Sequence, residues 1–153
     1  AIFYARGVLE TVKKLRWCPD IIHCHGWMTA LAPLYIKKAY KDEPSFRDAK
    51  VVFSVFEDDF KESFNADFIN RLVLKGVTKK DMAHLKAPVD YATLCKLAID
   101  YSDGVIQQSE NVNEEVMEYA RQAGKPILEY QTPETFAEAC NEFYDKVWET
   151  EQK

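Results

Sequence analysis

Apolar residues recur along the chain with two different spacings, and the spacing changes several times. Between residues 2 and 16 they recur every three to four positions, and basic residues within 13–16 follow, where cations stabilise a helix end. Segments 20–24 and 50–56 are short, rich in β-branched residues and bounded by turn residues, as buried strands are. The pattern therefore predicts one helix and two strands here. The apolar positions of the helix are Ile2, Ala5, Val8, Leu9, Val12 and Leu15.

The rest of the chain continues this alternation. Helices are predicted over about 29–40 and 67–74, from Asn113 to Gly124, and from Thr132-Pro133 to about 150, where a cap residue precedes proline at the first helical position. Strands are predicted over 104–108 and 126–130. Two further helices are predicted: a short one opened by a capping box, and one that starts at a proline. Their opening residues are Thr78-Lys79-Lys80-Asp81 and Pro88.

Strands separated by helices need crossover connections, so the sheet is expected to be parallel, with helices on both faces. The expected fold class is α/β: a Rossmann-like parallel sheet of about four strands in a single domain over 1–153, closed by the helix at about 133–150. In such a sheet, ligands collect where the strands end at their carboxyl edge. Three segments follow strands at that edge: His25-Gly26-Trp27, Glu57-Asp58-Asp59 and Ser109-Glu110.

Composition narrows the functional class. The chain has 153 residues, of which 47% are hydrophobic and 29% charged, as in an ordinary globular protein. Its 20 Lys and Arg against 25 Asp and Glu give a formal charge of −5, which argues against a nucleic-acid binder. No apolar run approaches the roughly 18 residues of a membrane span. A glycine-rich phosphate loop is not expected either, because the five glycines form no GxGxxG or GxxxxGKS/T pattern.

The four cysteines, Cys18, Cys24, Cys95 and Cys140, form no CxxC pair. In a domain large enough to bury its own core, this predicts reduced thiols and a cytoplasmic protein. The N-terminus shows no signal-peptide pattern, and the chain opens directly into a helical pattern without an initiator Met. We therefore expect it to be a piece of a longer polypeptide.

His23-Cys24-His25 lies at the end of the first predicted strand. Alternation along a strand sends both imidazoles to one face of the sheet and Cys24 to the other. A zinc ion would need two further ligands, and the only other histidine, His84, belongs to an unrelated segment, so a metal site is disfavoured. His23 is expected to be a hydrogen-bonded strand residue. His25 and Trp27, placed past the strand, are the better candidates for ligand contact.

Two other groups have a structural and a functional interpretation. Glu57-x-Asp59 resembles the acidic pair with which some glycosyltransferases hold a divalent metal, but adjacent acids after a strand more often form a solvated loop or a helix cap. The last predicted helix carries a continuous apolar stripe, which is expected to seal the sheet or an adjoining domain rather than to bind a cofactor. The stripe consists of Phe136, Ala139, Cys140, Phe143, Tyr144, Val147 and Trp148.

The segment from Pro19 to Tyr35 resembles the glycogen and bacterial starch synthases, which carry a PDIVHxHDWHTALxPxY signature. Here the matching residues read PDIIHCHGWMTALAPLY. The helix before this segment, the strand around Val52–Val55 and the stretch KLAIDYSDGVI, followed by Ser109, resemble the same family. The resemblance covers about residues 1–123 and is greatest to Bacteroidetes-type homologues.

The resemblance implies a glycosyltransferase of the GT-B fold, in which two Rossmann-like domains face a cleft. Members transfer glucose from ADP-glucose to an α-1,4-glucan with retention of configuration, and they use no metal or other cofactor. The chain corresponds to the second half of the N-terminal domain, which offers the glucan side and part of the glucose pocket. A second domain or a partner chain would bind ADP.

The implied substrate-binding positions are His25, Gly26, Trp27, Met28 and Phe56. Gly26 and Met28 stand where the family has Asp and His of HDWH, and Phe56 stands where the family has a His after its strand. A phenyl ring neither donates nor accepts a hydrogen bond in the way that imidazole does. No residue of the chain is therefore assigned as catalytic.

Two hypotheses follow from this resemblance. In the first, the chain is part of a glucosyltransferase and is inactive alone, because the side that binds the leaving group lies elsewhere. In the second, it is a degenerate module or regulatory homologue that binds glucan or a nucleotide sugar, with Trp27 as a stacking surface. The aromatic-rich last helix would close the fold without a second domain, which leads us to expect a parent protein that ends near Lys153.

Overall fold

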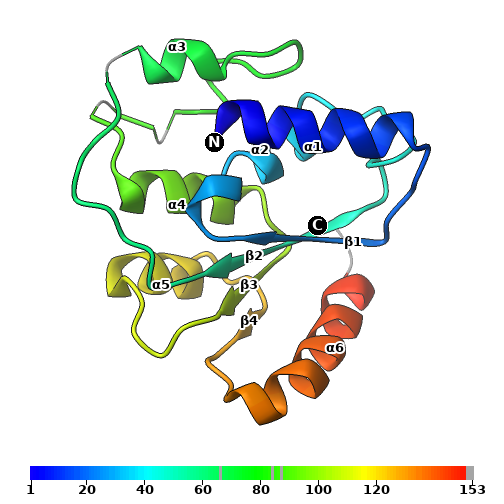
Figure 1. The fold of residues 1–153 in the computed structure, drawn as a ribbon, viewed down its shortest axis with the longest axis vertical. Helices are drawn as coiled ribbons and strands as arrows, with labels where there is room; N and C mark the ends of the chain where they lie inside the picture. Colours follow the sequence, from blue (N-terminus) through cyan, green and yellow to red (C-terminus); the bar gives the residue numbers. More distant parts are fainter. Residues whose placement is uncertain (66, 84, 87, 151–153) are drawn as a thin grey trace.

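Strands and helices alternate through the described part of the chain, residues 1–150 without 66, 84 and 87, in this computed structural model (Figure 1). The alternation confirms the α/β class. In chain order the elements are α1 (Ile2–Lys14), β1 (Ile21–His25), the 3₁₀ turn η1 (Trp27–Thr29), α2 (Ala32–Lys37), β2 (Lys50–Val55), α3 (Phe68–Leu72), α4 (Tyr91–Asp100), β3 (Gly104–Gln107), α5 (Glu114–Gln122), β4 (Ile127–Leu128) and α6 (Pro133–Glu149).

The four strands form one parallel sheet in the order β1-β2-β3-β4. Ile21 pairs with Lys50, Val52 with Gly104, and Val105 with Ile127. Because all the strands run the same way, their carboxyl ends lie at one edge, and the loops that follow β1, β2 and β3 leave the sheet there.

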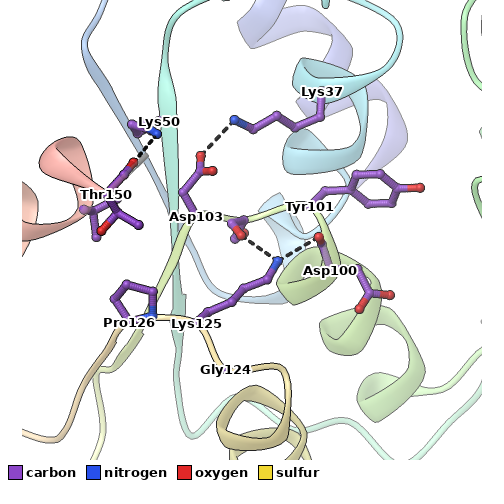
Figure 2. A pocket seen from close by; sticks show the side chains of 11 residues that line it. Lys37, Lys50, Asp100, Tyr101, Asp103, Gly124, Lys125, Pro126 and Thr150 are labelled. Carbon is purple, nitrogen blue, oxygen red and sulfur yellow. Dashed lines mark hydrogen bonds and ion pairs between the residues drawn. The ribbon is translucent and has the colours of Figure 1, made fainter. Parts of the chain in front are cut away.

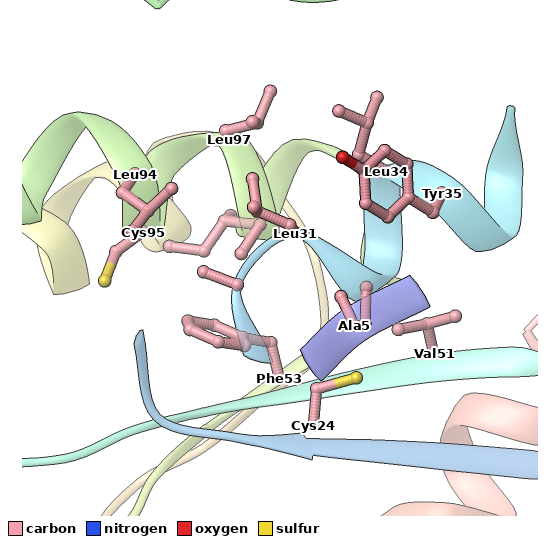
Figure 3. Packing of buried hydrophobic residues seen from close by; sticks show 14 of the residues in the cluster. Ala5, Cys24, Leu31, Leu34, Tyr35, Val51, Phe53, Leu94, Cys95 and Leu97 are labelled. Carbon is pink, nitrogen blue, oxygen red and sulfur yellow. The ribbon is translucent and has the colours of Figure 1, made fainter. Parts of the chain in front are cut away.

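Helices cover both faces of the sheet, as predicted. Val51 and Phe53 of β2 join the larger core cluster with residues of α1, α2, α4 and α5 (Figure 3). Val52, on the opposite face, packs with Ile106 against α6, which covers that side of the sheet (Figure 1). The period-two alternation of a strand therefore divides the core into two layers.

Local capping chemistry sets several helix boundaries. The Asn113 side chain accepts a hydrogen bond from the Val116 amide at 3.2 Å and begins α5, and Gly124 follows its end with φ +69°. Pro133 occupies the first turn of α6, after Thr132. These boundaries confirm the predicted start and end of α5 and the predicted start of α6.

The helix predicted over 29–40 is wrong in its extent. The chain instead forms the 3₁₀ turn η1 and then the short helix α2. Pro33 has no amide hydrogen to donate to the carbonyl of Thr29, so an uninterrupted α-helix through this segment would lack a bond. Pro33 sits instead in the first turn of α2, where no such bond is needed.

The helix predicted from the Thr78-Asp81 capping box is absent among the residues described there, and successive turns take its place. The Asp81 carboxylate does accept from the Thr78 amide at 2.9 Å, as in a capping box. The Asp81 carbonyl, however, accepts from the Tyr101 hydroxyl at 2.7 Å. The Leu85 amide, which would donate to this carbonyl in an α-helix, donates instead to the Met82 carbonyl at 2.9 Å.

The helix predicted to start at Pro88 begins later. Val89 forms an isolated antiparallel bridge with Phe64, whose amide donates to the Val89 carbonyl at 2.9 Å. Asp90 then caps α4 by accepting from the Thr93 amide at 2.8 Å. The extended backbone at Val89 excludes a helix there, and the acidic cap sets the helix start.

Smaller corrections concern the ends and faces of elements. The helix predicted over 67–74 is only Phe68–Leu72, and the strand predicted over 126–130 is only Ile127–Leu128. The first strand extends one residue further than predicted and includes His25. Val8 of α1 and Leu15, which directly follows the helix, are 43% and 71% exposed, so they lie outside the face that packs on the core.

Helix α6 approaches the sheet closely at Gly104. A Cβ atom added there would lie 2.7 Å from Val147 Cγ2 and 3.0 Å from Phe143 Cζ. Phe143 and Val147 are buried, as predicted for the stripe, whereas Trp148 is 47% exposed and was wrongly included in it. The missing side chain at Gly104 therefore lets α6 seal this face.

Replacing Gly104 with alanine should lower the free energy of unfolding by about 1–3 kcal/mol, because the added methyl overlaps Phe143 and Val147. Urea unfolding measures the change. Gly7→Ala is the matched control: Gly7 lies within α1 with no atom within 4 Å of a Cβ, so alanine should stabilise by about 0.5–1 kcal/mol. Equal effects of the two substitutions would contradict this packing account.

Candidate functional site

Three loops meet at the carboxyl edge of the sheet, as the order of the strands predicts. The Gly26 amide donates to the Ser54 carbonyl at 3.1 Å, and the Gln108 amide donates to the Val55 carbonyl at 2.9 Å. The Glu57 amide donates to the Ser109 hydroxyl oxygen at 3.1 Å. These bonds connect the segments after β1, β2 and β3 into one surface.

The two imidazoles of β1 share a face, as predicted. Their ring centroids lie 3.9 Å apart, while Cys24 is buried on the opposite face, where burial raises the pKa of its thiol to about 12 (Figure 3). His23 forms hydrogen bonds through Nδ1 with the Tyr144 hydroxyl at 2.6 Å and through Nε2 with Ser54 Oγ at 2.5 Å. His23 is therefore a structural strand residue, whereas His25 is exposed at the edge.

Burial is the main cause that lowers the pKa of His23 to about 4, and the neighbouring His25 adds to it. Partial desolvation of the ring also lowers the pKa of His25, although the residue as a whole is exposed. At pH 7 the His23 imidazole is neutral, with one nitrogen that donates and one that accepts. This matches its two hydroxyl partners, because each hydroxyl can take either role.

Gly26 turns the chain sharply out of the sheet. Its φ of 72° and ψ of 174° belong to a region that is essentially restricted to glycine. The next amide, of Trp27, donates to Asp58 Oδ2 at 3.1 Å, and Asp58 Oδ1 accepts from the Tyr91 hydroxyl at 2.8 Å. Asp58 therefore caps η1 and links it to α4.

The Trp27 ring packs into an aromatic cluster that sequence analysis missed. Its centroid lies 5.0 Å from that of Phe60 and 6.1 Å from that of Phe64. These three rings, with residues 61–63, line a cavity of about 480 Å³. The spacing of Phe60 and Phe64, four residues apart in a polar loop, was the only available signal.

The remaining predicted site residues lie around this turn. Phe56 is half-buried, with its ring centroid 6.0 Å from that of His25. Met28 is 43% exposed on η1. The structure thus brings His25, Gly26 and Phe56 together, whereas the Trp27 ring turns toward the loop after β2.

The acidic run Glu57-Asp58-Asp59 serves as capping and loop structure. Asp59 accepts from the Asn113 side-chain amide at 2.9 Å, so its carboxylate and that of Asp58 have different partners. Among the residues that the structure describes, no group of three or more His, Cys, Asp or Glu could hold a metal ion. His84, considered above as a ligand, lies outside the described residues.

A second cavity, of about 530 Å³, lies at the opposite, amino edge of the sheet (Figure 2). Its lysines are bound by the chain itself: Lys125 donates to three backbone carbonyls around the end of α4 at 2.5–2.7 Å. Lys37 pairs with Asp103 at 2.8 Å, and Lys50 donates to the Thr150 carbonyl at 2.8 Å. These cations hold the fold together, so the carboxyl edge is the better candidate site.

Comparisons with known proteins show the family of the chain. A family model described as the starch synthase catalytic domain matches residues 1–129. The chain belongs to the starch synthase catalytic-domain family. It is 34% identical over 122 residues to a glycogen synthase of Clostridium perfringens, covering 74% of this chain and 23% of that protein. A glycogen synthase of Chlorobium chlorochromatii is 33% identical over 135 residues, covering 86% of this chain and 27% of that protein.

A solved structure supports the same fold. The catalytic domain of starch synthase IV from Arabidopsis thaliana, bound to ADP and acarbose, superposes with a TM-score of 0.62 at 20% identity, over 84% of this chain and 28% of that one. The family architecture is GT-B, and the sheet described here is part of it. The chain spans about a quarter of the length of these synthases.

Two expectations from the sequence concern the cysteines and the hydropathy of the helices. All four cysteines are free, and only Cys18 is exposed. Within the described residues, every helix is too short or too polar to cross a bilayer.

The pH dependence of stability should depend on His23. Its pKa is lower in the folded chain, about 4, than the ordinary 6.5, so between these values the unfolded chain binds more protons. The free energy of unfolding should therefore fall as the pH falls from 6.5 to 4, and fall less in His23→Gln. Urea titrations at several pH values test this. The same slope in both proteins would show that His23 is not the group responsible.

Proposed function

We propose that this chain forms the glucan-binding side of a glycogen or starch synthase-type glucosyltransferase. The family reaction moves glucose from ADP-glucose to an α-1,4-glucan, and the structural neighbour is described as bound to ADP and acarbose. The observation that carries the proposal is the aromatic cavity beside Trp27, located at the carboxyl edge where sheets of this class bind ligands.

The chemistry of this edge suits a neutral sugar. Aromatic rings such as Trp27 and Phe60 offer apolar faces on which sugar rings stack, and His25 adds an exposed group that can hydrogen-bond a hydroxyl. The proposal assigns none of the nearby carboxylates to a metal, in line with the metal-independent reaction that the resemblance implies. It also places the protein in the cytoplasm, in line with its free thiols.

A second candidate is a binding module that has lost catalysis. It is favoured by Phe56, a side chain without hydrogen-bonding groups, where the family carries histidine. The two candidates differ in the natural gene product: the first releases ADP from ADP-glucose when glycogen is present, and the second binds glucan without releasing ADP.

The chain should bind maltoheptaose, and Trp27→Ala should weaken binding by about tenfold or more through loss of the stacking surface. Isothermal titration calorimetry measures both affinities. Trp17→Phe is the control, because Trp17 lies before β1, away from the carboxyl edge, and is 61% exposed. The absence of maltoheptaose binding by the wild-type chain would contradict the proposal.

The chain alone should release no ADP from ADP-glucose and glycogen, because we assign the leaving-group side of the reaction to a part of the synthase beyond residues 1–153. A coupled assay for ADP, with a complete glycogen synthase as positive control, checks this. Steady ADP release by the purified chain would show that the chain carries a full active site.

A further inference from the structure

Asp58 joins three segments of the candidate edge through one carboxylate. Oδ2 accepts from the Trp27 amide at 3.1 Å, and Oδ1 accepts from the hydroxyl of the buried Tyr91 at 2.8 Å. The Tyr91 hydroxyl also lies 3.1 Å from the Phe56 carbonyl. An ionised carboxylate has about four acceptor sites, and these two donors occupy two of them. Asp58 is half-buried, and no other group among the described residues donates a hydrogen bond to its carboxylate.

Asp58 also occupies the space beside Gly26. A Cβ atom built on Gly26 would lie 2.6 Å from Asp58 Oδ2 and 3.8 Å from Phe56 Cδ2. A side chain at position 26 and the Asp58 carboxylate therefore exclude each other in this arrangement. In the resemblance to the glycogen and starch synthases, Gly26 corresponds to the aspartate of their HDWH signature. In this chain, a carboxylate oxygen from the loop after β2 lies 2.6 Å from the point where the Cβ of such a side chain would be.

The neighbouring acids have other positions. The Asp59 carboxylate accepts from Asn113 at 2.9 Å, at the start of α5. Glu57 is exposed, and its backbone amide is the group bonded to Ser109. Of the three acids, Asp58 is the one that contacts the turn carrying Trp27.

We propose that Asp58 is the carboxylate of the sugar-binding edge: it positions Trp27 through the backbone amide and accepts a hydrogen bond from a hydroxyl of an α-glucan. This inference rests on the proposed function, since it assigns one more residue to the same glucan site. It also explains why position 26 is a glycine, because the absence of a side chain there leaves room for the Asp58 carboxylate.

The sugar contact is tested by titration with maltoheptaose in a Trp17→Phe/Trp148→Phe background, where fluorescence reports Trp27 alone. Asp58→Asn keeps the shape but loses the charge and an acceptor, so affinity should fall about tenfold. Glu57→Gln, the matched control, should stay within about twofold. In the chain with Asp58 intact, the ¹³Cγ resonance of Asp58 should shift when maltoheptaose is added. This measurement needs no variant, so it stays informative even if Asp58→Asn fails to fold.

The placement is tested by a double-mutant cycle that needs no ligand. Gly26→Ala is strained by its φ and ψ in any background, but it clashes with the carboxylate only when Asp58 is present. Its cost in urea unfolding should therefore be smaller in an Asp58→Gly background. Equal costs in both backgrounds would overturn the inference that the Asp58 carboxylate occupies the space that a side chain at position 26 would need.

The outcomes separate this inference from the proposed function. Absence of maltoheptaose binding by the chain with Asp58 intact would refute the proposed function, and with it the role of Asp58 toward sugar. If the chain binds maltoheptaose, Asp58→Asn and Glu57→Gln change the affinity equally, and the Asp58 ¹³Cγ resonance does not shift, then the inference about Asp58 is refuted while the proposed function stands. A selective loss in Asp58→Asn, together with the unequal costs of Gly26→Ala, would support it.

Discussion

Burial of β2 on both faces is the constraint on which the arrangement of the other elements depends. All six of its residues are buried: Phe53 faces the layer of α1, α2, α4 and α5, while Val52 faces α6. Such a strand must lie inside the sheet, so β1 and β3 pair along its two edges. Parallel pairing then brings the loops after all three strands to one edge, and the candidate site forms there.

Boundaries set by local chemistry could be predicted from the sequence, and boundaries set by distant partners could not. Asn113 and Gly124 mark the ends of α5 through their own side chain or φ angle. The segment after Thr78 has the residues of a helix start, yet the hydroxyl of Tyr101, from another segment, bonds the Asp81 carbonyl. No pattern in the local sequence predicts that contact, so the predicted helix is wrong.

The features of the candidate site likewise divide into those that the local sequence predicts and those that depend on distant partners. The period of a strand placed His23 and His25 on one face, and strand order brought the three loops together. The return of the loop after β2 onto Trp27 depends on packing by Phe60 and on the Asp58–Tyr91 bond, whose partners lie 33 residues apart. Sequence analysis therefore found the edge but missed what shapes it.

Mapping of backbone amide shifts during addition of a linear α-1,4-glucan tests most directly whether the carboxyl edge is the binding surface. The account predicts that the largest changes fall in the loops after β1 and β2, around Trp27 and Phe60, with little change at the amino-edge cavity near Lys125. Changes centred on Lys125, or spread evenly over the chain, would contradict it.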